Sequence, residues 1–330
     1  MRRILSQMFG AAPAARTKAP PPGPPPPPPP RKSPPPGAAS EGTERTWTST
    51  DGLDLSARDY APAAGPARLP VICLHGLTRN SRDFEGIAPA MAGAGRRVLA
   101  LDVRGRGRSA HDPNSSNYNP AVYAGDVAAL MSEAGLARAI FLGTSMGGLI
   151  AMTLATLRPD LIAGAILNDI GPEIATEGLT RIGGYVGAAE PAASWAEAAQ
   201  RSRAVNAVAL PNLSDADWMT FARRTWREVT PGRIVPDYDP AIAQAFAGAP
   251  AGSTQSSPDL WPLFMALAVN RPLLLIRGAQ SDLLTAGTAG RMQALAPQMR
   301  RLDIEGVGHA PTLDEPEARS AILDFLKTAP

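Results

Sequence analysis

Apolar residues in this chain fall into short runs of strand length that alternate with segments of helical period. Two short strands are predicted first, at 45–50 and 53–60, joined at Asp51-Gly52, a dipeptide typical of tight hairpin turns. The apolar strand runs that follow are 71–74, 98–101, 139–142, 163–167 and 272–276, and helices are predicted near 84–93, 121–134 and 148–157. This alternation predicts an α/β protein with a mostly parallel, doubly wound sheet covered on both faces.

The alternation stops at Gly171 and resumes at Pro272. Amphipathic segments occupy the region between them, at 177–185, 194–206, 214–224 and 240–246. We therefore predict a helical cap over 171–259, inserted after the sixth strand into a core formed by 41–170 and 260–330. The cap holds three of the five tryptophans; most of its rings are expected to form its own core, and one or two to face an apolar substrate.

Proline dominates residues 1–40, which are predicted to be a disordered, polyproline II tail. The tail carries six basic residues and no acidic one, which leaves 26 basic against 30 acidic residues in the body, a charge near −4. The isoelectric point of about 8.9 therefore describes the tail, and no nucleic-acid partner is expected. Such a tail could bind a proline-binding module, but a tail without a binding partner is the favoured interpretation.

No apolar run approaches the length of a membrane span, and Pro13 breaks the apolar stretch after Arg2-Arg3 too early for a secretory signal. A cytoplasmic protein with no membrane partner is expected. Cys73 is the single cysteine and lies in an apolar strand run, so we expect a buried core residue. The three scattered histidines have no metal-site spacing, and no metal or cofactor is expected; the oligomeric state is left open.

Gly143-Thr144-Ser145-Met146-Gly147 carries the main chemical signal of the chain. It fits the G-x-S-x-G nucleophile elbow, and it stands between a predicted strand and a predicted helix, as such an elbow requires. The flanking glycines are expected because a Cβ at either position would collide with the adjoining strand and helix. Ser145 is therefore the candidate nucleophile, held at the carboxyl end of a sheet strand.

A nucleophilic serine needs a general base and an acid that orients the base. His309 is the candidate base, because it lies in a glycine-flanked loop after the last strand-like run; His75 and His111 suit loop positions better. The candidate acid is Asp282, in the loop after 272–276, since a G-x-x-S-D loop is the commoner source of the acid in such sites. Asp169, which follows the run 163–167, is the alternative acid.

The oxyanion of a tetrahedral intermediate needs two hydrogen-bond donors. The residue after the nucleophile supplies one backbone N–H, here that of Met146. The loop after the third strand supplies the second, and Leu77, after His75-Gly76, is the candidate.

These motifs resemble the α/β-hydrolase superfamily, in the serine-nucleophile branch with a helical cap. The matching segments are His75-Gly76, residues 102–109, Ser145-Met146-Gly147-Gly148, Ser281-Asp282 and Gly308-His309. The resemblance implies Ser145 as nucleophile, Asp282 as acid and His309 as base, with the N–H groups of Leu77 and Met146 as oxyanion donors. Dehalogenases and epoxide hydrolases of this fold use an aspartate nucleophile, and Ser145 argues against both.

The favoured function is hydrolysis of a carboxylic ester or lactone of a small, mainly apolar substrate through an acyl-enzyme. One alternative is a C–C bond hydrolase of the meta-cleavage type, although those enzymes usually carry an aromatic residue where this chain has Ala310. The other alternative is a non-catalytic binding protein on a hydrolase fold. The complete set of candidate residues argues against it.

Overall fold

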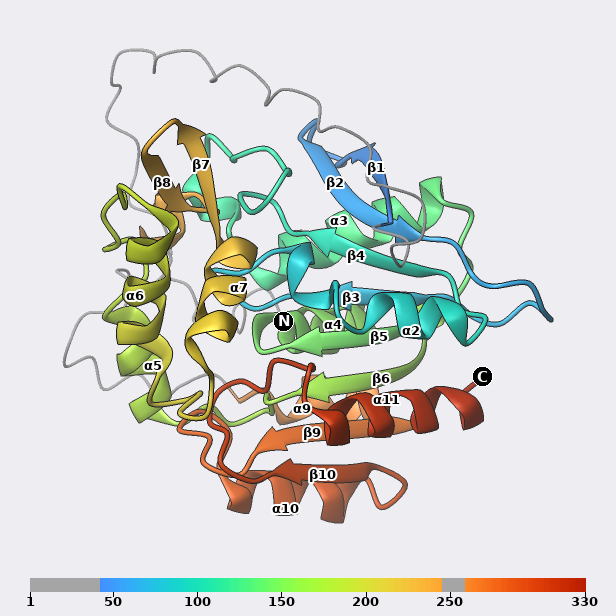
Figure 1. The fold of residues 1–330 in the computed structure, drawn as a ribbon. Helices are drawn as coiled ribbons and strands as arrows, with labels where there is room; N and C mark the ends of the chain where they lie inside the picture. Colours follow the sequence, from blue (N-terminus) through green and yellow to red (C-terminus); the bar gives the residue numbers. More distant parts are fainter. Residues whose placement is uncertain (1–41, 245–258) are drawn as a thin grey trace.

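A computed structural model describes residues 42–244 and 259–330 and has an eight-stranded sheet at its centre (Figure 1). The predicted tail at 1–40 and the last part of the predicted cap lie outside the described residues. The strands are β1 (Thr43–Thr48), β2 (Asp54–Tyr60), β3 (Val71–Leu74), β4 (Val98–Asp102), β5 (Ala139–Thr144), β6 (Ile162–Asn168), β9 (Leu273–Gly278) and β10 (Arg300–Ile304).

The strands lie in the order β1-β2-β4-β3-β5-β6-β9-β10. Strand β2 runs antiparallel to β1 and β4, and all the other neighbours are parallel. The predicted α/β fold with a mostly parallel sheet is therefore confirmed. Because β5 and β6 are neighbours, the residues that follow them meet at one edge of the sheet.

Helices cover both faces of the sheet. The core helices and 3-10 turns are η1 (Ser81–Phe84), α2 (Ala88–Gly93), η2 (Ser115–Asn117), α3 (Pro120–Glu133), α4 (Met146–Leu157), η3 (Pro159–Leu161), α9 (Trp261–Ala268), α10 (Ala286–Leu295) and α11 (Pro316–Thr328). Helices α3, α4, α9 and α10 pack on one face, and α2 and α11 on the other (Figure 1).

Successive strand residues point to opposite faces and so fill two separate cores. Ile72 and Leu74 of β3 belong to the core beneath α3 and α4, whereas Val71 and Cys73 belong to the core beneath α2 and α11. All four side chains are fully buried. Strands buried on both faces read as continuous apolar runs, which is why the sequence predicted them well.

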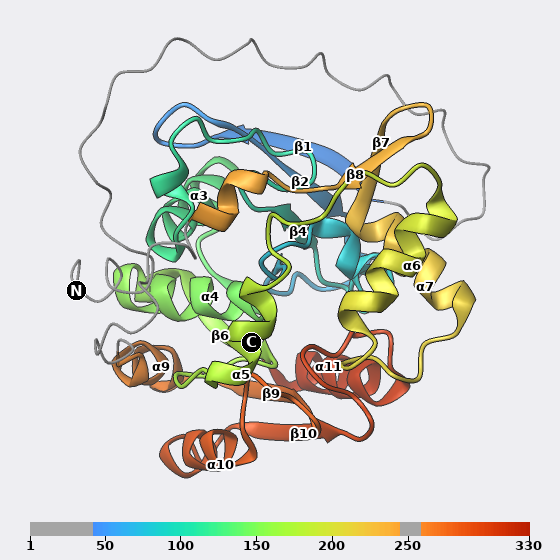
Figure 2. The same cartoon turned by 90° about the vertical axis from the view of Figure 1, so that its left-hand side faces the viewer.

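The described residues 171–244, which we call the insertion, lie beyond the carboxyl ends of the strands (Figures 1 and 2). Its elements are α5 (Thr176–Gly183), α6 (Trp195–Asn206), α7 (Asp215–Thr225), β7 (Trp226–Thr230), β8 (Arg233–Pro236) and η4 (Pro240–Ala243). The first three helices lie where helices were predicted. The β7–β8 hairpin was not predicted, so the insertion is not purely helical.

No helix within 42–244 or 259–330 has the length and apolar character needed to cross a membrane.

Candidate active site

Ser145 lies in the turn between β5 and α4 with an unusual backbone, φ 51° and ψ −115°. Such a conformation is strained for a residue with a side chain and persists only where the surroundings fix it. A Cβ on Gly147 would lie 2.0 Å from the carbonyl oxygen of Leu74 in β3, and one on Gly143 would lie 2.5 Å from the carbonyl carbon of Gly147. The predicted need for glycine at both positions is confirmed.

Ser145, His309 and Asp169 form a continuous hydrogen-bonded chain. The distance between His309 Nε2 and Ser145 Oγ is 2.9 Å, and that between His309 Nδ1 and Asp169 Oδ2 is 2.8 Å. Because a carboxylate accepts, Nδ1 carries the proton and Nε2 accepts from the serine hydroxyl. His309 is thus in the tautomer that can take a proton from Ser145.

The carboxylate of Asp169 is completely buried and held by the backbone around it. Asp169 directly follows β6 and has a backbone φ of 54°. Besides the bond to His309, Oδ1 accepts from the N–H of Gly278 at 2.9 Å and Oδ2 accepts from Ser281 Oγ at 2.6 Å. These donors occupy both carboxylate oxygens and fix the direction of the group toward the imidazole.

Asp282 was predicted to be the partner of His309, and the structure contradicts that contact. Its carboxylate accepts two hydrogen bonds from Arg181 in α5, at 2.6 and 2.8 Å. The Arg181 guanidinium holds the pKa of Asp282 below its usual value. Asp169, the alternative acid, lies beside the imidazole. The end of β9 and the loop after it reach the same site, where Gly278 and Ser281 bind the Asp169 carboxylate.

Of the two residues predicted to donate to the oxyanion, Met146 directly follows Ser145 and Leu77 lines the same cavity as Ser145. Met146 is the first residue of α4, so its N–H has no partner within the helix. The N–H of Leu77 has no hydrogen-bond partner among the residues that the structure describes. Both groups are therefore available to a ligand.

His75 holds the peptide group that carries the Leu77 N–H. Its Nδ1 donates to the carbonyl oxygen of Gly76 at 2.7 Å, and its Nε2 accepts from the N–H of Val103 at 3.0 Å. Complete burial lowers the pKa of His75 to about 4, so the imidazole is neutral near pH 7. A hydrogen bond to this carbonyl polarises the peptide and strengthens its N–H as a donor.

Arg106 is fully buried and binds the loop that contains Leu77. Its Nε donates to the carbonyl of Leu77 at 2.9 Å, its Nη1 donates to Tyr123 Oη at 2.9 Å, and its Nη2 lies 3.5 Å from Met146 Sδ. No carboxylate forms an ion pair with it in the described part of the chain. His75 and Arg106 both lie in segments that match the family motifs, at 75–76 and 102–109, but their hydrogen bonds were not predicted, because a motif does not show which buried atoms a side chain contacts.

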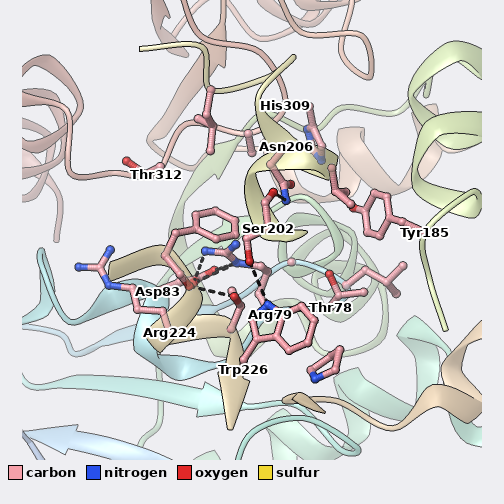
Figure 3. A pocket seen from close by; sticks show the side chains of 18 of the residues that line it. Thr78, Arg79, Asp83, Tyr185, Ser202, Asn206, Arg224, Trp226, His309 and Thr312 are labelled. Atoms are coloured by element: carbon pink, nitrogen blue, oxygen red, sulfur yellow. Dashed lines mark hydrogen bonds and ion pairs between the residues drawn. The ribbon is translucent and has the colours of Figure 1, made fainter. Parts of the chain in front are cut away.

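A cavity of about 650 Å³ opens above Ser145 between the sheet edge and the insertion. Apolar side chains of its wall include Ile182, Leu210, Leu213 and Phe221, all from the insertion. Charged groups also reach it, and Figure 3 shows Arg79, Asp83 and Arg224 together on one side. Apolar and charged side chains therefore both line the pocket. Within 42–244 and 259–330, no cluster of His, Cys, Asp or Glu is placed to hold a metal ion.

A family model described as the alpha/beta hydrolase fold matches residues 70–316. The chain belongs to this family, and the resemblance drawn from its motifs is confirmed. An α/β hydrolase from Novosphingobium aromaticivorans is similar in structure, with a TM-score of 0.80 and 44% identity over 87% of this chain and 98% of that one.

Two relatives of known activity match most of the chain. The 3-hydroxybutyrate-oligomer hydrolase of Cupriavidus necator is 32% identical over 277 residues, 79% of this chain and 89% of that enzyme. The 2-(acetamidomethylene)succinate hydrolase of Mesorhizobium japonicum is 28% identical over 257 residues, 78% of this chain and 87% of that enzyme. The protein is thus an enzyme, a hydrolase of the α/β fold.

Proposed function

We propose that this enzyme hydrolyses carboxylic esters of small substrates through a covalent acyl-enzyme on Ser145. The observation that carries the proposal is the unbroken chain from Ser145 Oγ through His309 to Asp169, with distances of 2.9 and 2.8 Å, at the base of the cavity. An activated serine, an imidazole and a buried carboxylate are the groups that acyl transfer requires.

In the proposed mechanism, Ser145 Oγ attacks the ester carbonyl while His309 Nε2 takes its proton. Asp169 stabilises the imidazolium that forms. The N–H groups of Leu77 and Met146 bind the oxyanion, and His309 returns the proton to the departing alcohol. A water molecule, deprotonated by His309, then attacks the acyl-enzyme and releases the acid.

In this proposal the insertion belongs to a cap with boundaries at 171–259 and supplies the apolar wall of the pocket. Relatives give a guide to substrate size: the Cupriavidus enzyme is named for oligomers of 3-hydroxybutyrate, which are linked by ester bonds. A cavity of about 650 Å³ has the volume typical of small-molecule sites. Short esters of hydroxy acids are therefore the first substrates to test.

A fluorophosphonate probe tests the nucleophile directly. It is expected to label the wild type and to leave Ser145→Ala unlabelled. Ser132→Ala, which removes an exposed serine of α3, serves as the matched control and should be labelled normally. Labelling of Ser145→Ala at another serine would refute the assignment, and failure to label the wild type would favour the binding-protein alternative.

Turnover of short p-nitrophenyl esters tests the reaction class. Measurable hydrolysis is expected, together with little or no cleavage of a meta-cleavage dienoate, because Ala310 rather than an aromatic residue follows His309. Dienoate cleavage faster than ester hydrolysis by orders of magnitude would replace the ester hydrolase with the C–C hydrolase.

A further inference from the structure

Arg79 lies beside the nucleophile, two residues after the proposed oxyanion donor Leu77. A Cβ placed on Gly76 would lie 3.4 Å from Arg79 Cγ and 3.8 Å from Ser145 Cβ, so the stem of the arginine and the reactive serine both lie close to Gly76. The residue lines the same cavity as Ser145 and His309 (Figure 3). A substrate acylating Ser145 would therefore lie within reach of this side chain.

One edge of the Arg79 guanidinium is already occupied. Nε lies 2.9 and 3.1 Å from the two carboxylate oxygens of Asp83, and Nη2 lies 2.7 Å from Oδ1. The planar face stacks on the ring of Phe221 at 4.0 Å. Carboxylate and ring together fix the orientation of the guanidinium before any ligand binds.

The other edge of the same guanidinium is unused. A guanidinium has five N–H donors, and the Asp83 contacts leave both hydrogens of Nη1 and one of Nη2. Nη1 has no hydrogen-bond partner among the residues that the structure describes. Two parallel N–H groups on one planar edge match the two oxygens of a carboxylate.

A second arginine–carboxylate pair lines the pocket on this side. Arg224 Nη1 donates to Asp314 at 2.6 Å, and Figure 3 shows Arg224 near Asp83. The formal charges of Arg79, Asp83, Arg224 and Asp314 cancel, so this wall does not select anions by excess positive charge. Selection would instead depend on the fixed geometry of the unused edge.

We propose that the Nη1 and Nη2 edge of Arg79 binds a carboxylate carried by the ester substrate. The substrate class is then the hydroxy-acid ester with a free acid end, rather than a wholly apolar ester. This proposal rests on the proposed ester hydrolysis at Ser145 and adds a specificity-determining residue to it.

Wild-type enzyme gives the first test, with the linear dimer of 3-hydroxybutyrate and its methyl ester as paired substrates. The two compounds share the internal ester bond, and its cleavage is monitored by the initial release of 3-hydroxybutyrate from the acid and of methyl 3-hydroxybutyrate from the methyl ester, because the terminal methyl ester is a second hydrolysable bond. We expect kcat/KM to be about tenfold or more higher for the free acid, because a charge-assisted pair is worth more than a neutral contact. Equal values for the two, with robust hydrolysis of both, would overturn the carboxylate site and leave the proposed function intact.

Variants then locate the preference. Arg79→Met should bring the acid-to-methyl-ester ratio close to one, and Arg79→Lys should restore it only in part, because an ammonium lacks the fork. The double variant Arg79→Met with Asp83→Leu removes both charges and avoids leaving Asp83 unpaired. Arg203→Met, which removes an exposed arginine paired with Asp215 on the outside of the insertion, is the matched control.

Retention of the full preference in both Arg79→Met and the double variant would overturn the role of Arg79. Loss of preference in Arg203→Met as well would also overturn it, since the effect would then not be local. Absence of turnover with every ester, charged or uncharged, would instead overturn the ester hydrolase proposal itself, and this substrate class with it.

Discussion

Asp169 and Asp282 differ at the scale of single residues in ways that bear on their roles. Asp169 is fully buried and accepts bonds from an imidazole, a hydroxyl and a backbone N–H. The side chain of Asp282 is 32% exposed and bound to Arg181. Only the first arrangement keeps a carboxylate fixed on the imidazole while the imidazole gains a proton.

We therefore predict that Asp169→Asn lowers kcat on a p-nitrophenyl ester by about 10³-fold or more, because an amide can hold the wrong tautomer of His309. Asp282→Asn should lower kcat by less than about tenfold, since it disturbs only the Arg181 pair. Steady-state kinetics of both variants provides the measurement. Comparable losses, or a larger loss at Asp282, would return the acid to the position favoured by the sequence.

The choice between these two aspartates could not be made from the chain alone. Both follow apolar strand runs and both precede His309. The partners of their side chains separate them, and these appear only in the folded structure. Ser281 adds to the difficulty, because its hydroxyl binds Asp169 although it stands next to Asp282. The sequence could nominate the other site residues because each belongs to a local motif: Ser145, His309, Leu77 and Met146.

His75 gives a pH prediction of definite sign. Its pKa is about 4 in the folded protein against an ordinary value of 6.5, so between these pH values the unfolded chain binds a proton that the folded one does not. Stability from this group is complete above pH 6.5 and falls as the pH drops toward 4. Relative to His75→Gln, wild type should lose about 2 kcal/mol of its free energy of unfolding between pH 7.5 and 5.

Urea unfolding of both proteins at the two pH values measures this difference. Burial raises the pKa of Asp102 to about 6, which acts with the opposite sign, but Asp102 is present in both proteins and cancels. A wild-type advantage that stayed constant with pH would show that His75 is not held neutral.

At the scale of elements, the strand-turn-helix unit of β5 and α4 depends on close backbone approach at Gly147. We predict that Gly147→Ala destabilises the fold by about 1 to 3 kcal/mol and removes esterase activity, since its Cβ would lie 2.0 Å from Leu74 O. Gly125→Ala in α3 is the matched control: its Cβ meets nothing within 4 Å, and it should stabilise by about 0.5 to 1 kcal/mol.

Thermal unfolding and p-nitrophenyl ester turnover measure both substitutions. A Gly147→Ala enzyme with the melting temperature and rate of the wild type would mean that the backbone of β3 at Leu74 can move aside at little cost in free energy. The helical glycine tests the same change of one methyl group where space is open, so the contrast isolates the contact with Leu74.

Most elements were predictable because parallel strands and amphipathic helices leave strong patterns. The β7–β8 hairpin was missed although Pro231-Gly232, a turn signal, lies between its strands and Gly232 has φ 74°. Its strands are short, and β7 is largely exposed, so neither shows an apolar run. Helices α9, α10 and α11 were not predicted either. In α9 most residues are apolar and pack against α4 and the sheet, so no polar face marks it as amphipathic.

At the scale of the whole molecule, the two ends of the parallel strands serve separate purposes. The carboxyl ends carry Ser145, Asp169 and the loops of the pocket. The opposite edge is closed by Arg96, two residues before β4, which is 1% exposed. Its guanidinium donates to the carbonyls of Leu69, Leu326, Ala329 and Pro330 at 2.7 to 2.9 Å.

Arg96 thus links the start of β3 and β4 to the end of α11, and it satisfies carbonyls that a helix C-terminus leaves without partners. We predict that Arg96→Met lowers the free energy of unfolding by about 2 to 4 kcal/mol, through lost charge-assisted bonds and buried acceptors left unpaired. The values of kcat and KM should be unchanged below the melting temperature, because the residue is at the far edge from Ser145.

Arg68→Met is the matched control for Arg96→Met, since Arg68 is exposed and reaches the same Leu326 carbonyl only at 3.4 Å. It should change stability by less than about 0.5 kcal/mol. Denaturant unfolding and ester kinetics of the two variants separate the roles of the two sheet edges. An Arg96→Met enzyme with unaltered stability but altered kcat/KM would show that the sheet edge remote from Ser145 is coupled to the site, and that the two ends of the strands do not have separate roles.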